Sequence, residues 1–219
     1  MKCVLITILA VFSLAIVAFG GDDTAKVKKT GSDAPEAEKK MEAEKYVKRQ
    51  ADNPEIAVET SFGTMKFELF RDVAPIHVDS TLARIREGFY DSLKIFRIIA
   101  NFMAQTGDPQ NRGSGSAGYN LPAEFSDLPH LRGTLSMARS QDPNSASCQF
   151  FICFVRLQAL DKKYTVFGHM MEGEDVLKKL EAVEVKVNPF TSEKAMPVED
   201  VYMKKVTILK DIKKAKPEN

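Results

Sequence analysis

Apolar and polar residues alternate along two short segments near the start of the folded part of the chain. The first surrounds Ile56–Val58, the second surrounds Phe67–Leu69, and Ser61–Thr64 lies between them. A period of two is typical of half-buried strands, and Gly63 suits a tight turn. The pattern predicts a β-hairpin that begins near Glu55.

Two segments carry the helical spacing of apolar residues instead. The first runs from Pro75 to Glu87, with Pro75 in its first turn and Gly88 after its end. The second runs over residues 174–183. Their apolar stripes consist of Val78, Leu82 and Ile85 in the first, and Val176, Leu177 and Leu180 in the second.

The remaining apolar runs predict short strands and no further helix. We expect strands at residues 93–99, 134–138, 149–154, 164–168 and 201–208. A doubly wound fold would need strands and helices in alternation, and the middle 80 or so residues contain no good helix. We therefore expect a mainly β protein, with a closed or nearly closed antiparallel sheet and two capping helices.

The N-terminal part has the pattern of a targeting segment. Lys2 precedes the apolar run Val4–Phe19, and small residues follow it. This is the layout of a secretory signal, although the run is also only slightly shorter than the roughly 20 residues that span a bilayer. We therefore interpret residues 1–20 as a signal peptide or a retained membrane anchor, and expect export to the periplasm or cell envelope.

The next segment is rich in charge and poor in apolar residues. Nine of the fourteen residues from Glu36 to Arg49 are charged, four acidic and five basic. We interpret residues 21–54 as a flexible charged tether, with a partner-docking helix as the alternative. The folded domain is expected at residues 55–210, followed by a polar tail at 211–219.

Composition excludes several classes of function. Lys+Arg 31 against Asp+Glu 30 gives a net charge of +1, which provides no field to attract nucleic acid. Three cysteines and three histidines have neither disulfide-scaffold nor metal-ligand spacing, so we expect no metal and no cofactor. The three histidines, at positions 77, 130 and 169, are interpreted as surface or capping residues.

Some polar residues lie in unexpected places, and a glycine-rich loop needs explanation. Arg97 lies on an apolar strand face in LKIFRII, where an edge-strand arginine that reaches solvent is the simpler interpretation. Gln105 and Gln149 adjoin aromatic residues and could belong to a core cluster or a groove wall. The loop GSGSAG at 113–118 matches G-x-G-x-x-G but leads into no helix, which excludes dinucleotide binding. Cys148 and Cys153 flank a strand too far apart for a disulfide.

Four stretches of the sequence together resemble the cyclophilin family of peptidyl-prolyl cis/trans isomerases. They are FYDSLKIFRIIANFMAQTGDP (89–109), RGSGSAGYNLPAEF (112–125), GTLSMARSQDPNSASCQFFICF (133–154) and LDKKYTVFGHM (160–170). The resemblance covers some 70% of the chain, and the third stretch is more similar to bacterial members.

This resemblance implies an eight-stranded antiparallel β-barrel capped by two α-helices, with the active groove on its outer face. It implies that Arg97 is the catalytic arginine and Gln105 the glutamine beside it. The substrate-binding residues implied are Phe102, Met103, Gly113, Ala138, Arg139, Ser140, Gln149, Phe151, Leu160 and Tyr164. The expected partners are proline-containing polypeptides and not nucleic acid, a membrane tether remains possible if the N-terminus is retained, and the protein is expected to be a monomer.

Three departures from the family pattern leave an alternative open. Ile95-Phe96 replaces the usual Phe-His before the arginine, Ala159 replaces a rim tryptophan, and Tyr164 replaces the groove histidine. Ala159 predicts weak binding of cyclosporin, and because none of the departures removes Arg97 we expect an active but slower enzyme. The alternative is a non-catalytic module at the cell envelope that binds or chaperones proline-containing segments.

Overall fold

The predicted hairpin forms the start of the fold in the computed structural model, which describes residues 52–211. β1 (Glu55–Thr60) and β2 (Gly63–Leu69) pair antiparallel through a two-residue loop, because Thr60 faces Gly63. Gly63 has a φ of 132°, and a Cβ there would lie 2.9 Å from Cγ2 of Val176. Glycine therefore provides both the conformation and the close approach at this turn.

The segments predicted at both ends of the chain lie outside the described residues. These are the signal peptide or anchor at 1–20, nearly all of the tether at 21–54 and nearly all of the tail at 211–219. At the boundary, Asn53 is buried and its Nδ2 donates to Oε1 of Glu68 at 2.9 Å. The folded unit thus includes the residues just before Glu55.

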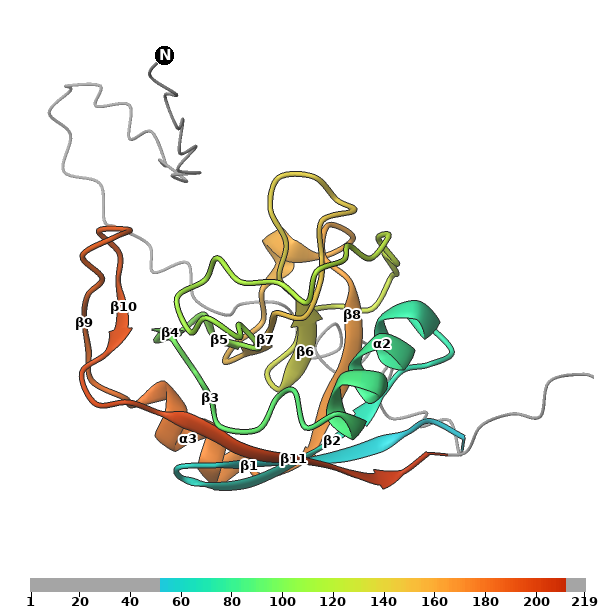
Figure 1. Cartoon of the computed structure of the whole chain (residues 1–219), viewed down its shortest axis with the longest axis horizontal. Coiled ribbons are helices and arrows are strands. Elements are labelled where there is room, and N and C mark those ends of the chain that lie inside the picture. The colour runs from blue at the N-terminus through green and yellow to red at the C-terminus, as the bar shows by residue number, and fades with distance from the viewer. Residues whose placement is uncertain (1–51, 212–219) are drawn as a thin grey trace, which may run out of the picture.

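Nine antiparallel strands form one curled sheet (Figure 1). Their order across the sheet is β3 (Leu93–Lys94), β11 (Tyr202–Lys210), β1, β2, β8 (Val166–Glu172), β6 (Thr134–Met137), β7 (Phe150–Cys153), β5 (Met103–Thr106) and β4 (Arg97–Ile99). The mainly β architecture with two helices is confirmed.

The expected single strand at 93–99 is wrong, because the chain bends there. It splits into β3 and β4, which lie at opposite ends of the sheet although only Ile95 and Phe96 separate them. Both intervening side chains are buried, and the Ile95 amide donates to the Val201 carbonyl at 2.8 Å. This short link holds the two ends of the sheet together and curls it into a half-barrel.

Both predicted helices are present. α2 (Pro75–Arg86) packs against β11, and α3 (Glu174–Glu181), which ends two residues before its predicted end, packs against β2. A short 3-10 helix, η1 (Gln158–Leu160), is the other helical segment of the described chain. None of these helices has the length and apolar character needed to cross a membrane.

Three short strands were not predicted. β5 belongs to the main sheet, and β9 (Val185–Val187) pairs with β10 (Lys194–Pro197) in a separate two-stranded hairpin. Figure 1 shows this β9–β10 hairpin beside β4, against which β10 packs. The hairpin lies next to the edge strand that carries Arg97.

Strand alternation separates the buried side chains into an interior core and a small outer cluster. Phe150 and Ile152 of β7 join the interior core, whereas Phe151 and Cys153 face the opposite side with Met103. Phe102, Ala138, Leu160 and Tyr164 pack around this outer cluster. The outer face of the sheet therefore has an apolar surface of its own.

Two predictions about buried residues have different outcomes. Cys148 and Cys153 are buried free thiols, as expected. The interpretation of all three histidines as surface or capping residues is wrong, because His77 and His130 are fully buried. Each imidazole is paired with a carboxylate, Glu124 for His77 and Asp161 for His130, which reduces the cost of burial.

Candidate active site

Arg97 lies on edge strand β4 and its guanidinium is hydrogen-bonded on two sides. Its Nη1 donates to Oε1 of Gln105 at 3.1 Å. Its Nε and Nη2 donate to the two carboxylate oxygens of Glu193 at 2.6 and 2.8 Å. The side chain is 33% exposed. The edge position agrees with the simpler interpretation of Arg97, but the side chain is fixed rather than free in solvent.

A chain of amide hydrogen bonds extends from the arginine into the glycine-rich loop. Nε2 of Gln105 donates to Oε1 of Gln149 at 2.9 Å, and Nε2 of Gln149 donates to the Gly115 carbonyl at 2.8 Å. Both glutamines are half-buried. They belong to a groove wall, so the alternative left open by the sequence is decided in favour of the groove.

Beside this chain lies an apolar pocket of about 120 Å³, here called the first pocket. Its floor and walls come from the outer apolar cluster on the sheet, and the Arg97–Gln105 pair closes one side. The lining residues are Arg97, Phe102, Met103, Gln105, Ala138, Arg139, Phe151, Leu160 and Tyr164. An apolar cavity with a few fixed polar groups is the usual form of a ligand site.

A second pocket of about 280 Å³ adjoins the first and shares Gln105, Ala138 and Arg139 with it. It differs from the first pocket in that serines and glycines, and no aromatic residues, form its walls. Gly113, Ser140 and Gln149 line it, together with Ser114, Gly115, Ser116, Ser145 and Ser147. All twelve residues singled out as catalytic or substrate-binding thus line one of two adjoining pockets.

The glycine-rich loop at the second pocket is organised by a buried carboxylate. Asp108 is fully buried, and its oxygens accept the backbone N–H groups of Gln110 at 2.6 Å and Arg112 at 3.1 Å, and that of Gly113. A Cβ on Gly115 would lie 1.9 Å from Oδ1 of Asp108. The glycines therefore allow the loop to wrap around this carboxylate.

Tyr164 and Arg139 form the opposite rim of the first pocket. The guanidinium of Arg139 lies 4.5 Å from the centre of the Tyr164 ring, and it donates to the Lys163 carbonyl. Tyr164 also contacts Phe151 edge to face, with ring centres 6.0 Å apart. Ala159, by contrast, is exposed and lines neither pocket.

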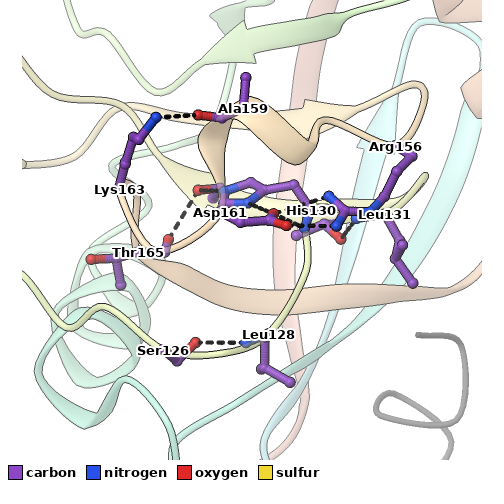
Figure 2. Close-up of polar contacts among 11 residues, drawn as sticks. Ser126, Leu128, His130, Leu131, Arg156, Ala159, Asp161, Lys163 and Thr165 are labelled. Atoms are coloured by element: carbon purple, nitrogen blue, oxygen red, sulfur yellow. Dashed lines mark hydrogen bonds and ion pairs between the residues drawn. The ribbon is translucent and has the colours of Figure 1, made fainter. Parts of the chain in front are cut away.

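A polar network is centred on the buried His130, and Figure 2 shows its contacts with Asp161 and Arg156. The His130 ring stacks on Phe151 with centres 6.2 Å apart. Nδ1 of His130 lies 3.1 Å from Oδ1 of Asp161, and Arg156 donates to both oxygens of Asp161 at 3.0 and 2.6 Å. Because Asp161 directly follows Leu160, the network connects the pocket floor to its rim.

Charges in this network are set by burial and pairing. Burial lowers the pKa of His130 below its usual value, against the opposing effect of its hydrogen bond to Asp161. Burial alone would raise the pKa of Asp161, but hydrogen bonds from Arg156 and His130 outweigh it and lower that pKa. The histidine is therefore neutral and the aspartate charged near neutral pH.

Ser136 completes an arrangement that superficially resembles a hydrolase triad. Its Oγ lies 3.0 Å from Nε2 of His130. Both residues are fully buried, and the hydroxyl donates to the Thr165 carbonyl at 3.1 Å. No substrate could reach this hydroxyl, so the network supports the pocket rather than supplying a nucleophile. Within residues 52–211, no three His, Cys, Asp or Glu side chains gather into a metal-binding group.

Sequence reasoning missed two parts of this site. Glu193 lies 96 positions from Arg97, in the β9–β10 hairpin, and no local pattern marks it. The His130–Asp161 pair also joins distant segments, although the short spacing of Asp161 from Leu160 could have drawn attention to it. In each case, the two side chains come from distant segments and meet only in the folded chain.

The fold is a curled antiparallel sheet with two helices, and its outer face bears an apolar pocket beside a fixed arginine–glutamine pair. This combination defines a class of half-barrel proteins with a groove on the outside of the sheet. The family model described as "Cyclophilin type peptidyl-prolyl cis-trans isomerase/CLD" matches residues 55–208. The chain belongs to this family.

Individual relatives agree with this membership. A probable peptidyl-prolyl cis-trans isomerase of Brucella suis is 43% identical over 130 residues, covering 54% of this chain and 66% of that protein. A peptidyl-prolyl cis-trans isomerase of Synechococcus elongatus is 40% identical, covering 54% and 81%. The isomerase-like 3 protein of Gallus gallus is 36% identical, covering 70% and 94%.

Solved structures show the same fold. A cyclophilin type isomerase of Cryptosporidium parvum has a TM-score of 0.67 at 28% identity, covering 73% of this chain and 99% of that one. A second structure of it, described as in the presence of the dipeptide Ala-Pro, has a TM-score of 0.66 at 29% identity, covering 72% and 99%. These neighbours support the half-barrel assignment.

Proposed function

We propose that this protein is a peptidyl-prolyl cis/trans isomerase that accelerates rotation about X-Pro bonds in polypeptides. The observation that carries the proposal is the position of the Arg97–Gln105 pair at the side of an apolar pocket. Family membership and the isomerase names of its relatives support it. The Ala-Pro dipeptide named with the Cryptosporidium structure supports proline-containing peptides as substrates.

The chemistry requires no cofactor. Rotation about X-Pro is slow because the partial double bond of the amide imposes a barrier of about 18–20 kcal/mol. No covalent bond breaks. Twisting the amide localises the lone pair on the prolyl nitrogen, and a fixed guanidinium N–H can then donate to it. This interaction exists in the transition state and is absent from the planar ground state, so it raises the rate.

The residues of the groove divide this task. Arg97 would donate to the twisted nitrogen, and Gln105 would hold Arg97 in place. The first pocket, formed by Phe102, Met103, Phe151 and Leu160, would hold the proline ring. Gln149, the backbone at Ala138 and Arg139, and the second pocket with Gly113 and Ser140 would hold the flanking peptide, with Tyr164 at the rim. Lowering the barrier by about 5 kcal/mol would give nearly 10⁴-fold acceleration.

The test is cis/trans exchange in a short X-Pro peptide, measured by NMR without a coupled protease. Wild-type protein should accelerate exchange, and Arg97→Ala should reduce the acceleration about 100-fold or more, as for loss of a transition-state donor. Binding of the peptide by folded wild-type protein without acceleration would reject the isomerase. That result would support the alternative, a non-catalytic module that binds proline-containing segments.

We also propose that the protein is exported to the periplasm or cell envelope and acts there as a monomer. The apolar run Val4–Phe19 after Lys2 supports export, and bacterial relatives are compatible with such a compartment. Mass spectrometry of the protein from fractionated cells tests this. A new N-terminus near residue 21 supports a cleaved signal, an intact N-terminus in the membrane fraction supports an anchor, and intact protein in the cytoplasm rejects export. Analytical ultracentrifugation of the purified protein tests whether it is a monomer in solution.

A further inference from the structure

Glu193 reaches the groove from outside the main sheet. It directly precedes β10 in the β9–β10 hairpin, and β10 packs against β4, the strand of Arg97. Its backbone carbonyl accepts the Asn188 amide at 2.8 Å, and the Asn188 carbonyl accepts the Ser192 amide at 2.8 Å. These bonds close the hairpin loop and fix the point from which the Glu193 side chain extends.

The Glu193 carboxylate forms a two-point contact with the Arg97 guanidinium. One carboxylate oxygen accepts from Nε at 2.6 Å and the other from Nη2 at 2.8 Å. Parallel bonds of this kind fix the plane of a guanidinium as well as its position. The arginine also lowers the pKa of the Glu193 carboxyl, chiefly through these hydrogen bonds. Glu193 is therefore charged at neutral pH.

The number of donors shows that this contact leaves Arg97 able to act. A guanidinium has five N–H groups. Glu193 occupies the Nε–H and one N–H of Nη2, and Gln105 occupies one N–H of Nη1. One N–H remains on each of Nη1 and Nη2, so the carboxylate need not leave before a peptide binds.

An arginine in this position needs such support. Arg97 lies on an edge strand with 33% of its side chain exposed, so packing alone does not fix it. An unrestrained arginine side chain occupies many rotamers, and ordering it in the transition state would oppose the reaction. Gln105 contacts a single nitrogen of the Arg97 guanidinium, whereas Glu193 contacts two nitrogens on its opposite edge.

We propose that Glu193 is a positioning residue for Arg97, holding the Nε–Nη2 edge so that the remaining N–H groups meet the twisted prolyl amide. This inference rests on the proposed isomerase function. It assigns to the β9–β10 hairpin a role in the rate of the reaction, because the hairpin carries the carboxylate to the groove.

The first experiment measures kcat and KM for the full protein and for Glu193→Gln. The variant keeps the size of the side chain but loses the charged two-point contact. We expect a fall of about three- to tenfold in kcat, with KM little changed. Glu193→Asp, which keeps the charge on a shorter arm, should lie between the two. Wild-type activity or higher in Glu193→Gln would overturn the proposal, and a change confined to KM would also do so.

A matched control separates positioning from effects of charge and folding. Glu199→Gln makes the same charge change at an exposed site just after β10, where the side chain lines a different pocket. Its kinetics and melting temperature should equal those of the wild type, and Glu193→Gln should melt at the same temperature. Lysine cannot form a two-point contact with a carboxylate. In an Arg97→Lys background, Glu193→Gln should therefore cause no further fall in kcat. If Glu193→Gln lowers kcat by the same factor in the Arg97→Lys background as in the wild type, the proposal is overturned.

A readout that does not depend on activity distinguishes this inference from the proposed function. The Nε–Hε signal of Arg97 in NMR should be sharp and slow to exchange in the wild type, and should broaden in Glu193→Gln but not in Glu199→Gln. An unchanged signal in Glu193→Gln would reject the positioning role even in an active enzyme. A wild-type protein without isomerase activity would instead reject the function, whatever the signal.

Discussion

Arg97 and Gln105 lie directly opposite each other in the register of β4 and β5, and the arginine donates to the glutamine at 3.1 Å. The same glutamine donates to Gln149, so it holds the arginine from one side and the groove wall from the other. The pairing of two adjacent strands thus aligns the Arg97 guanidinium with the pocket.

Gln105→Leu should therefore reduce the rate without unfolding the protein. Leucine has similar size but cannot accept from Arg97, and hydrogen bonds to charged groups contribute about 1.5–3 kcal/mol. We expect kcat/KM to fall about tenfold or more in the NMR exchange assay. The exposed Gln141→Leu is the control, and equal activity of the two variants would contradict the role of Gln105.

Phe150 and Phe151 provide a comparison between the two faces of β7. Phe150 faces the interior core, whereas Phe151 lines the first pocket with 5% of its surface exposed. Each change to Leu should lower the free energy of unfolding by about 1–2 kcal/mol, measured in urea. Only Phe151→Leu should also raise KM for an X-Pro peptide. An equal rise in KM for Phe150→Leu would contradict the assignment of the pocket.

Glu124 should stabilise α2 from a distant part of the chain. Its two carboxylate oxygens accept the backbone N–H groups of Ile76 and His77, each at 3.0 Å, at a helix start whose N-cap residue is Ala74. This arrangement replaces a local cap and places negative charge at the positive end of the helix. Glu124→Ala should lower the free energy of unfolding by about 1–2 kcal/mol in urea denaturation. If the free energy of unfolding does not change within error, water satisfies the backbone N–H groups of Ile76 and His77 in the variant.

Stability should fall as the pH decreases through the usual pKa of histidine. Burial lowers the pKa of both His77 and His130 in the folded state, although hydrogen bonds to Glu124 and Asp161 oppose it. The unfolded chain, with histidine pKa values of about 6.5, then binds more protons than the folded one below that pH. The free energy of unfolding is therefore highest above pH 6.5 and decreases toward the lowered folded pKa values.

Urea denaturation at pH 7.5, 6.5 and 5.5 measures this dependence. The free energy of unfolding should be lower at pH 5.5 than at 7.5, and His77→Gln should reduce the difference because one of the two groups is removed. Asp161 does not interfere, since its lowered pKa affects stability only in more acidic solution. Equal stability at pH 5.5 and 7.5 would contradict the inferred shifts.

The local elements of this fold could be predicted from sequence because their signals are local. The β1–β2 hairpin and both helices follow from apolar spacing, a turn glycine and Pro75 at a helix start. The strand predicted at 93–99 is too long, because an apolar run does not reveal the bend at Ile95 and Phe96. β9 and β10 are only three and four residues long, which is too short for an alternating apolar pattern that predicts a strand.

The candidate site was predicted through family resemblance, and all twelve residues meet along one groove. From the residues alone, Arg97 and the two glutamines could not be distinguished from surface or core residues. Their hydrogen-bond partners come from other strands and from loops, and side-chain alternation determines only the face on which each residue lies.

The sequence by itself determined the β1–β2 hairpin and the two helices, since spacing and backbone preferences act over a few residues. Only the tertiary structure decided that Glu193 meets Arg97 across 96 positions, that Glu124 caps α2, and that His130 lies under Phe151. These contacts depend on the tertiary fold, which brings distant segments together and pairs polar side chains from them. A buried charge requires a partner, but the sequence does not indicate which distant residue provides it.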